Sequence, residues 1–181
     1  MECPWSQDLY IKAYQYAAKA HNGQLLPGSE LPYIVHLSFV SMEIMAALTE
    51  DYRKLDGNLA IQCALLHDTM EDAGISYYEI RDIFGQRVAD GVNALSKRSM
   101  FATKKEKMID SLVRIKTQPI EVWMVKLADR ITNLMPPPSH WSEKKIENYR
   151  EEAKLIFTAL KGANEYLASR LYMKIEGYPF G

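Results

Sequence analysis

The stretch Leu65-Leu66-His67-Asp68-Thr69-Met70-Glu71-Asp72 joins an apolar run to a cluster of one imidazole and three carboxylates. Side chains three or four residues apart lie on one face of a helix, so Asp68, Glu71 and Asp72 should point roughly the same way, with His67 beside them. Acidic side chains are rarely buried unless they are paired or bind a metal. The stretch therefore predicts a helix that leaves the core and ends at a divalent-metal site.

Helical spacing of apolar residues dominates the chain, and the alternation typical of strands is nearly absent. The pattern predicts a helix capped by Ser6, one over about 34–49, one that carries the opening motif, a short one capped by Ser76, one after Gly85, and three over about 122–134, 143–160 and 163–175. Residues 22–32 hold two Gly and two Pro and should form a loop. Residues 97–107 are either a loop or the start of a helix. The fold class is therefore all-α, with residues 1–181 in one domain.

The composition indicates a globular protein without a polyanionic partner. The 22 Lys and Arg nearly balance the 23 Asp and Glu, which gives no overall reason to expect a nucleic acid polymer or a membrane as partner. No apolar stretch approaches the roughly 18 residues that span a bilayer. Cys3 and Cys63 are too few for a disulfide framework, and the first residues lack the regions of a signal peptide. We therefore expect free thiols and a cytoplasmic location.

Four residues from separate parts of the chain are candidate metal ligands: His36, His67, Asp68 and Asp129. Asp129 interrupts the apolar helix 122–134, one turn ahead of Asn133 on the same face. Two imidazoles and two carboxylates suit Mn²⁺, Fe²⁺ or Zn²⁺ and leave positions open for water and substrate.

Each candidate also has a simpler explanation. A single histidine in a helix, such as His36, is commonly packed or solvated, and Asp129 could pair with a neighbouring cation. Taken together, these explanations require several independent coincidences. His21 ends the first helix, where the helix C-terminus favours an imidazolium, and His140 follows the triple proline and should be exposed. We place neither in the metal cluster.

With these motifs the chain resembles the HD-domain phosphohydrolases, and specifically the RelA/SpoT-type hydrolase domain in its single-domain form, the small alarmone hydrolases. The matching strings are Ala20-His21-Asn22-Gly23-Gln24, Pro32-Tyr33-Ile34-Val35-His36, the opening stretch, Phe84-Gly85, Val125-Lys126-Leu127-Ala128-Asp129-Arg130, Asn133-Leu134, Trp141-Ser142-Glu143 and Tyr149. They follow the expected order over nearly the whole chain.

The resemblance implies a single-domain helical bundle with a central metal site, in which His36, His67, Asp68 and Asp129 hold one Mn²⁺. It implies that Glu71 and Asp72 manage the attacking water, without saying which is the base. Relatives remove the 3′-pyrophosphate of guanosine tetra- and pentaphosphate, (p)ppGpp, and some animal relatives dephosphorylate NADPH. The substrate contacts expected from the match are Asn133, Lys97, Ser96, Arg130, Tyr33 and Leu26.

The chain departs from the family in its first loop. Leu25-Leu26-Pro27-Gly28 stands where relatives carry an Arg-Lys pair that binds guanosine, and Leu37 follows His36 where relatives have Pro. A guanidinium stacks on a base and supplies charge, which Leu26 and Pro27 do not.

This departure leaves three functions open at the level of sequence. The first is hydrolysis of (p)ppGpp or a close analogue, and the second is a phosphatase acting on NADPH or another 2′- or 3′-phosphorylated nucleotide. The third is a catalytically silent module that binds an alarmone. Each takes a small nucleotide as partner, and the oligomeric state stays open.

Overall fold

The computed structural model describes residues 4–51 and 55–179, so the predicted free thiol of Cys3 lies outside the described residues. Within this part the chain forms ten helices and no β-strand, which confirms the all-α prediction. The helices are α1 (Gln7–Ala20), α2 (Ile34–Glu50), α3 (Gly57–Leu66), α4 (Thr69–Asp72), α5 (Tyr77–Phe84), α6 (Gln86–Leu95), α7 (Lys104–Lys116), α8 (Ile120–Asn133), α9 (Glu143–Leu160) and α10 (Glu165–Gly177).

Local caps define where most of these helices begin. The hydroxyls of Ser6, Ser76 and Ser142 accept hydrogen bonds from backbone N–H groups three residues later, as the sequence predicts. Three starts differ from the expected ones, and one of them is that of α8, which begins at Ile120, two residues earlier than expected. Thr103 and Glu106 form a capping box that starts α7. Residues 97–107, for which the sequence allows a loop or the start of a helix, therefore form a loop up to Thr103 and a helix from Lys104. Asn164 caps α10, which begins two residues later than expected.

The opening motif does not lie on one helix, and that expectation is wrong. Helix α3 ends at Leu66, and α4 starts anew at Thr69. The Thr69 hydroxyl donates to the Leu66 carbonyl at 2.6 Å, and Asp68 has a backbone near the bridge region, with φ −97° and ψ −3°. His67 and Asp68 therefore sit at a corner between two helix axes.

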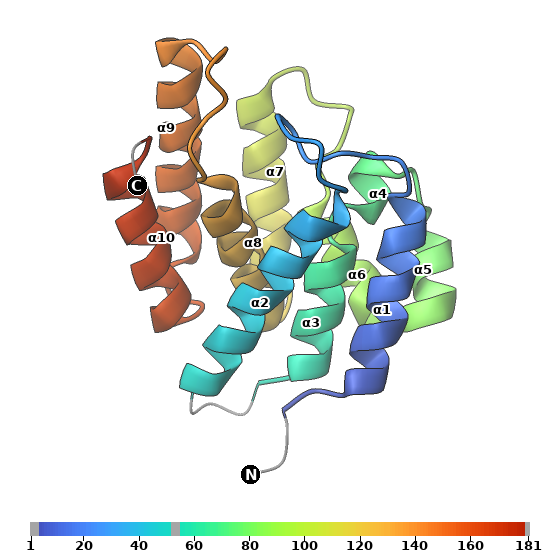
Figure 1. Cartoon of the computed structure of the whole chain (residues 1–181). Coiled ribbons are helices and arrows are strands. Elements are labelled where there is room, and N and C mark those ends of the chain that lie inside the picture. Colours follow the sequence, from blue (N-terminus) through green and yellow to red (C-terminus); the bar gives the residue numbers. More distant parts are fainter. Residues whose placement is uncertain (1–3, 52–54, 180–181) are drawn as a thin grey trace.

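Helix α3 lies at the centre of the bundle. All its residues except Asn58 are buried, and it contacts α1, α2, α6 and α8. A helix that is apolar all round is stable only when covered on every side. Figure 1 shows α1, α2 and α3 side by side, with the pair α9 and α10 at the opposite edge from α5. The end of α3 is thereby carried deep into the molecule.

A glycine lets α6 approach α3 and α8 closely. A β-carbon on Gly91 would lie 2.7 Å from the Cys63 Sγ and 3.0 Å from a Val122 methyl carbon. Cys63 is buried and free, and burial raises the pKa of its thiol to about 12, so the thiol is inert.

In the described part of the chain, no helix combines the length and apolar character that crossing a membrane requires.

A buried carboxylate ties α2 to α10. Glu43 is 3% exposed, and its oxygens accept hydrogen bonds from the Arg170 guanidinium, with Nε at 2.7 Å from Oε2. The arginine side chain is about one-third exposed, so the pair is only partly shielded from water. It nevertheless compensates a carboxylate that would otherwise be buried alone.

We expect Arg170→Met to lower the free energy of unfolding by about 2 kcal/mol, because it leaves the Glu43 carboxylate buried without its partner. Denaturant unfolding followed by circular dichroism measures this change. The matched control is Lys154→Met, which breaks the exposed Lys154–Glu151 pair and should leave the unfolding midpoint unchanged. Equal effects of both variants would contradict a structural role for the Glu43–Arg170 pair.

Candidate metal centre

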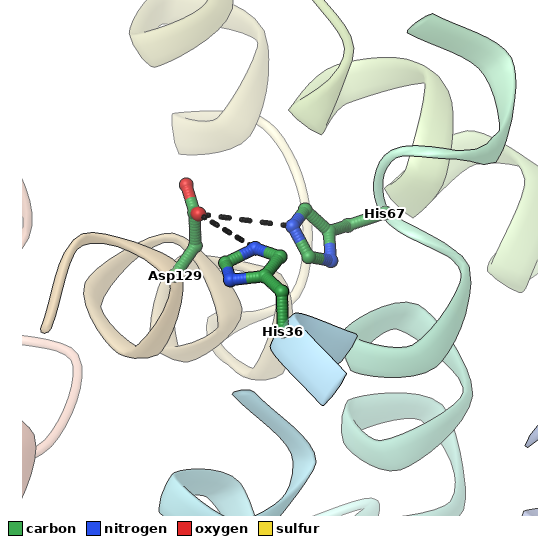
Figure 2. Close-up of side chains that lie close together, drawn as sticks. All are labelled: His36, His67 and Asp129. Atoms are coloured by element: carbon green, nitrogen blue, oxygen red, sulfur yellow. Dashed lines mark ion pairs between the residues drawn. The ribbon is translucent and has the colours of Figure 1, made fainter. Parts of the chain in front are cut away.

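Three separate segments carry the candidate ligands to one point. His36 lies in the first turn of α2, His67 and Asp68 occupy the corner after α3, and Asp129 lies in α8. Figure 2 shows both imidazole rings pointing toward the carboxylate of Asp129. His36, His67 and Asp129 are 3%, 3% and 5% exposed, so the cluster is buried. They form a group whose ligand atoms all lie within 4.8 Å of one another.

The distances fit a shared cation. Asp129 Oδ1 lies 3.5 Å from His36 Nε2 and 3.7 Å from His67 Nε2. Asp68 Oδ2 lies 3.7 Å from His36 Nε2 and 3.0 Å from His67 Nε2. Two ligand atoms that bind one divalent ion at about 2.1 Å are about 3.0–3.6 Å apart. His36, His67 and Asp129 thus have the spacing of ligands around a single ion, and Asp68 lies within 3.7 Å of both histidines.

The hydrogen bonding of His67 is a second test of that fit. Its Nδ1 lies 2.8 Å from the Ala64 carbonyl, which assigns the proton to Nδ1 and leaves a lone pair on Nε2. Nε2 is buried and has no hydrogen-bond partner among the described residues. Burial lowers the pKa of His67, but Asp68 and Asp129 outweigh it and raise the pKa to about 10. The negative potential that favours a proton on Nε2 also favours a divalent cation there.

Asp129 is held by its own helix. Lys126 Nζ donates to Oδ2 at 2.9 Å, and the Asn133 amide donates to Oδ1. Burial raises the pKa of Asp129, but Lys126 and the histidines lower it well below its usual range. Asp129 therefore pairs with the cation of Lys126 and also belongs to the cluster. Its Oδ2 accepts from Lys126, and its Oδ1 faces the two histidines.

The Glu71–Asp72 pair lies on α4, beside the cluster. The Lys97 backbone N–H donates to Glu71 at 2.8 Å, and Lys97 Nζ lies 3.4 Å from the other Glu71 oxygen. Asp72 Oδ2 lies 3.5 Å from the Tyr33 hydroxyl. Burial and the charges of Asp68 and Glu71 raise the pKa of Asp72. The two carboxylates are therefore held differently, with Glu71 tied to Lys97 and Asp72 more loosely bound.

A cleft of about 830 Å³ leads to the cluster and reaches His36, Asp68, Glu71, Asp72 and Asp129. One part of its wall is cationic and is supplied by Lys97, Lys104, Lys107, Lys126, Arg130, Lys144 and Lys145. Another part is apolar or aromatic and is supplied by Leu26, Pro27, Phe39, Pro136, Pro137, Pro138, Trp141 and Tyr149. A hollow of about 1330 Å³ on α9 and α10 contains none of the candidate ligands. The cleft at the cluster has the composition expected of a pocket for a phosphorylated aromatic molecule.

Five of the six predicted substrate contacts line this cleft: Leu26, Tyr33, Lys97, Arg130 and Asn133. Ser96 does not, because its side chain is buried and its hydroxyl donates to the Val92 carbonyl at 2.8 Å. The roles of all six stay predictions.

Sequence analysis missed two contacts behind the cluster. The Tyr33 hydroxyl donates to Asp68 Oδ2 at 2.6 Å, and the His21 ring stacks on Tyr33 with centroids 4.8 Å apart. Burial and Asp68 raise the pKa of Tyr33, so its hydroxyl keeps the proton that it donates. His21 is outside the ligand set, as expected, but it is buried, whereas His140 is exposed as expected. The only sequence signal for these contacts was that His21 and Tyr33 lie in two of the strings that match the family. Neither string indicates that the two side chains stack on each other.

These features define an all-helical protein with a buried His–Asp cluster suited to a divalent metal. Residues 13–165 match the family model described as HD domain. The chain belongs to the HD-domain family.

Its relatives include bacterial proteins that are much longer than this chain. It is 38% identical to a GTP pyrophosphokinase of Myxococcus xanthus, over 96% of this chain and 22% of that protein. It is 34% identical to the bifunctional (p)ppGpp synthase/hydrolase SpoT of Escherichia coli (strain K12), over 77% of this chain and 20% of that protein. The chain thus spans about a fifth of the length of these bacterial relatives.

Other relatives match along most of their length. The guanosine-3′,5′-bis(diphosphate) 3′-pyrophosphohydrolase MESH1 of Xenopus tropicalis is 29% identical, with 90% of each chain covered. A solved structure described as a metazoan ortholog of SpoT that hydrolyzes ppGpp aligns with a TM-score of 0.79 and 24% identity, over 95% of this chain and 96% of that one. The structural match shows a shared fold.

We expect Mn²⁺ at 100 times its Kd to stabilise the EDTA-treated protein by about 2.7 kcal/mol, because the ion binds the folded cluster alone. For a chain of this size the melting midpoint should rise by about 5–10 °C, measured by differential scanning fluorimetry. His67→Ala should abolish the rise and His140→Ala should retain it. The same rise in both variants would show that Mn²⁺ binds elsewhere.

Proposed function

We propose that the protein is a metal-dependent phosphohydrolase that removes the 3′-pyrophosphate of (p)ppGpp or a close analogue, giving GDP or GTP and pyrophosphate. The observation that carries the proposal is the buried group of His36, His67 and Asp129 at the end of a cationic cleft, with Asp68 within 3.7 Å of both histidines. The relatives named for (p)ppGpp hydrolysis support the choice of substrate.

We assign the ligand role to those four side chains and propose Mn²⁺ as the ion, since imidazole and carboxylate ligands together suit it. Such an ion supplies a Lewis acid, which offsets phosphoryl charge and makes water more acidic. Asp129 is fixed for this role by Lys126 and Asn133. His67 is fixed by the Ala64 carbonyl, which sets its tautomer.

Glu71 and Asp72 orient the attacking water and accept its proton. Both line the cleft, one turn beyond Asp68 on α4. Burial lowers the pKa of Lys97, but Glu71, Asp129 and Asp68 together raise it above its usual value, so an ammonium stays beside Glu71 and faces the cleft. That charge also attracts the phosphoryl oxygens of the substrate.

The remaining cleft residues sort the substrate by class. Lysines from the starts of α7 and α9 bind phosphate oxygens, and Trp141 offers an apolar ring to the nucleoside. Leu26 and Pro27 carry no side-chain donor or acceptor, so the first loop packs against a base without reading its edge. A β-carbon on Gly28 would lie 3.1 Å from Pro138 Cγ, which shows how closely this loop approaches the triple proline.

A phosphatase for NADPH or another 2′- or 3′-phosphorylated nucleotide is the second candidate, favoured by the absence of guanosine-binding side chains in the first loop. It differs from the first candidate by its product, which is orthophosphate.

The cytoplasmic location expected from the free thiols stays a prediction.

We expect the Mn²⁺-loaded protein to release pyrophosphate from ppGpp, detected by ion chromatography of the products. EDTA, His67→Ala and Asp68→Ala should each abolish the release, and His140→Ala should not. Orthophosphate from NADPH without cleavage of ppGpp would replace the proposed activity by the second candidate. Metal-loaded protein that turns over none of ppGpp, pppGpp, ppApp and NADPH would instead indicate a binding module.

We expect Glu71→Gln and Asp72→Asn each to lower kcat by about 100- to 10 000-fold, because each removes a carboxylate that handles the water proton. Steady-state kinetics with ppGpp at saturating Mn²⁺ measures both. The variant with the larger loss identifies the base. A kcat unchanged in both would exclude the pair from the reaction.

A further inference from the structure

Tyr33 lies immediately before α2, one turn ahead of His36. It is the N-cap residue of the helix, yet its side chain makes no capping hydrogen bond. The side chain turns instead toward the corner between α3 and α4, where its ring lies 5.5 Å from that of His36. The start of α2 therefore brings two aromatic side chains to the cluster.

The hydroxyl of Tyr33 contacts the oxygen of Asp68 that faces the histidines. It donates to Oδ2 at 2.6 Å, and this same oxygen lies 3.0 Å from His67 Nε2 and 3.7 Å from His36 Nε2. A carboxylate held by one donor at this distance is restricted in its rotation about the Cβ–Cγ bond. The bond therefore selects which Asp68 oxygen points into the cluster.

The same hydroxyl also lies 3.5 Å from Asp72 Oδ2. One O–H group is thus shared between a candidate ligand and one member of the pair proposed to handle water. The two carboxylates are four residues apart, across the start of α4. Their relative position consequently depends on a side chain that is 35 residues earlier in the sequence than Asp68.

A second layer fixes Tyr33. His21 stacks on its ring at an interplanar angle of 27°, and His21 Nδ1 lies 2.7 Å from Gln24 Oε1. Gln24 in turn donates through Nε2 to the Asp72 carbonyl at 2.9 Å, and its own carbonyl accepts from the Tyr33 N–H at 3.0 Å. The base of the first loop, Leu25 to Pro32, is closed by an antiparallel β-bridge. Tyr33 is therefore held on the side of the first loop, its ring by His21 and its backbone by Gln24.

We propose that Tyr33, supported by His21, is a positioning residue that orients Asp68 for the metal and Asp72 for water, rather than a substrate contact. This inference rests on the proposed function for the role of Asp72 and on the metal site for the role of Asp68. Hydrogen bonds from outside the ligand set orient metal ligands, and losing one lowers metal affinity or activity by about 10- to 100-fold. The substrate-contact role expected from sequence predicts a different outcome, a change in KM alone.

The first test is Tyr33→Phe, which removes one oxygen and keeps the ring that stacks on His21. Mn²⁺ is titrated into EDTA-treated protein, and the electron paramagnetic resonance signal of free Mn²⁺ gives the Kd. We expect the Kd to rise about 10- to 100-fold. The matched control is Tyr16→Phe, because the Tyr16 hydroxyl also donates to a carboxylate, Glu79, at 2.6 Å but outside the cleft. Its Kd should stay within twofold of the wild-type value.

The second test is kinetic and uses saturating Mn²⁺. A positioning role predicts that Tyr33→Phe lowers kcat for ppGpp while KM stays within twofold. A rise in KM at unchanged kcat and unchanged Mn²⁺ affinity would make Tyr33 a substrate contact and overturn the inference.

His21→Ala separates the two roles further, because it leaves every atom of Tyr33 in place. We expect a smaller rise in the Mn²⁺ Kd, in the same direction, since the ring loses its stacking partner. Melting of the metal-free variants by circular dichroism shows whether each is folded. A folded pair of variants with wild-type Mn²⁺ affinity would overturn the inference.

Failure of the proposed function leaves a distinct result. If the wild-type protein binds Mn²⁺ and does not cleave ppGpp, the substrate assignment fails and the Mn²⁺ titration still decides the role of Tyr33 toward Asp68. If the wild-type protein binds no Mn²⁺ at all, both the metal site and the inference are overturned.

Discussion

The carboxylates of Asp68 and Asp129 both lie close to His36 and His67 inside the bundle. Their negative charge is the constraint on which the rest of the site depends. An ionised group in a protein interior is stable only with compensating charge or hydrogen bonds. The chain places a donor on each carboxylate from outside the cluster, Lys126 on Asp129 and Tyr33 on Asp68. Tyr33 donates to the same Asp68 oxygen that faces the histidines, and Asn133 donates to the Asp129 oxygen that faces them, so a proton or a cation at the histidines completes the compensation.

The centre of the fold is arranged to make that burial possible. Helix α3 is apolar on all sides, so it is stable only when α1, α2, α6 and α8 cover it. Its last residue, Leu66, is fully buried, and the chain turns at His67 and Asp68 before α4 begins. The turn is what allows His67 to face the cluster while Glu71 and Asp72, on a helix of different direction, face the cleft. A continuous helix would have carried all four along one line.

The sequence predicts those parts of the structure that local signals determine. Ser6, Ser76 and Ser142 mark helix starts because a cap needs only residues three positions apart. Thr103 and Glu106 have the same spacing, so the sequence also contains a local signal for the start of α7. The end of α3 could not be predicted, because residues 65–72 have helical spacing throughout and contain no Gly or Pro that would mark the break.

The candidate site also has parts that the sequence predicts and parts that it does not. His36, His67, Asp68 and Asp129 can be grouped from sequence because their residue types are unusual on apolar helices. The structure brings His36, His67 and Asp129 together and places Asp68 beside the two histidines. The bonds from Tyr33 to Asp68 and from Lys97 to Glu71 join segments 35 and 26 residues apart, and no spacing rule connects them. Polar contacts of this kind follow from the tertiary arrangement, so the family resemblance, which gives Tyr33 and Lys97 as substrate contacts, does not reveal them.

The first loop belongs to both parts of the site. Its base, through Gln24 and Tyr33, is bonded to α4 and to Asp68, whereas Leu26 and Pro27 beyond it face the cleft. A substitution at the base disturbs buried carboxylates, but a substitution at Leu26 or Pro27 changes only what the cleft presents to a ligand. Loops tolerate change where they lie on the surface and resist it where their backbone or side chains are bonded to the core. The departure from the family pattern falls at Leu26 and Pro27, so it changes the side chains that line the cleft and lies outside the cluster of His36, His67, Asp68 and Asp129.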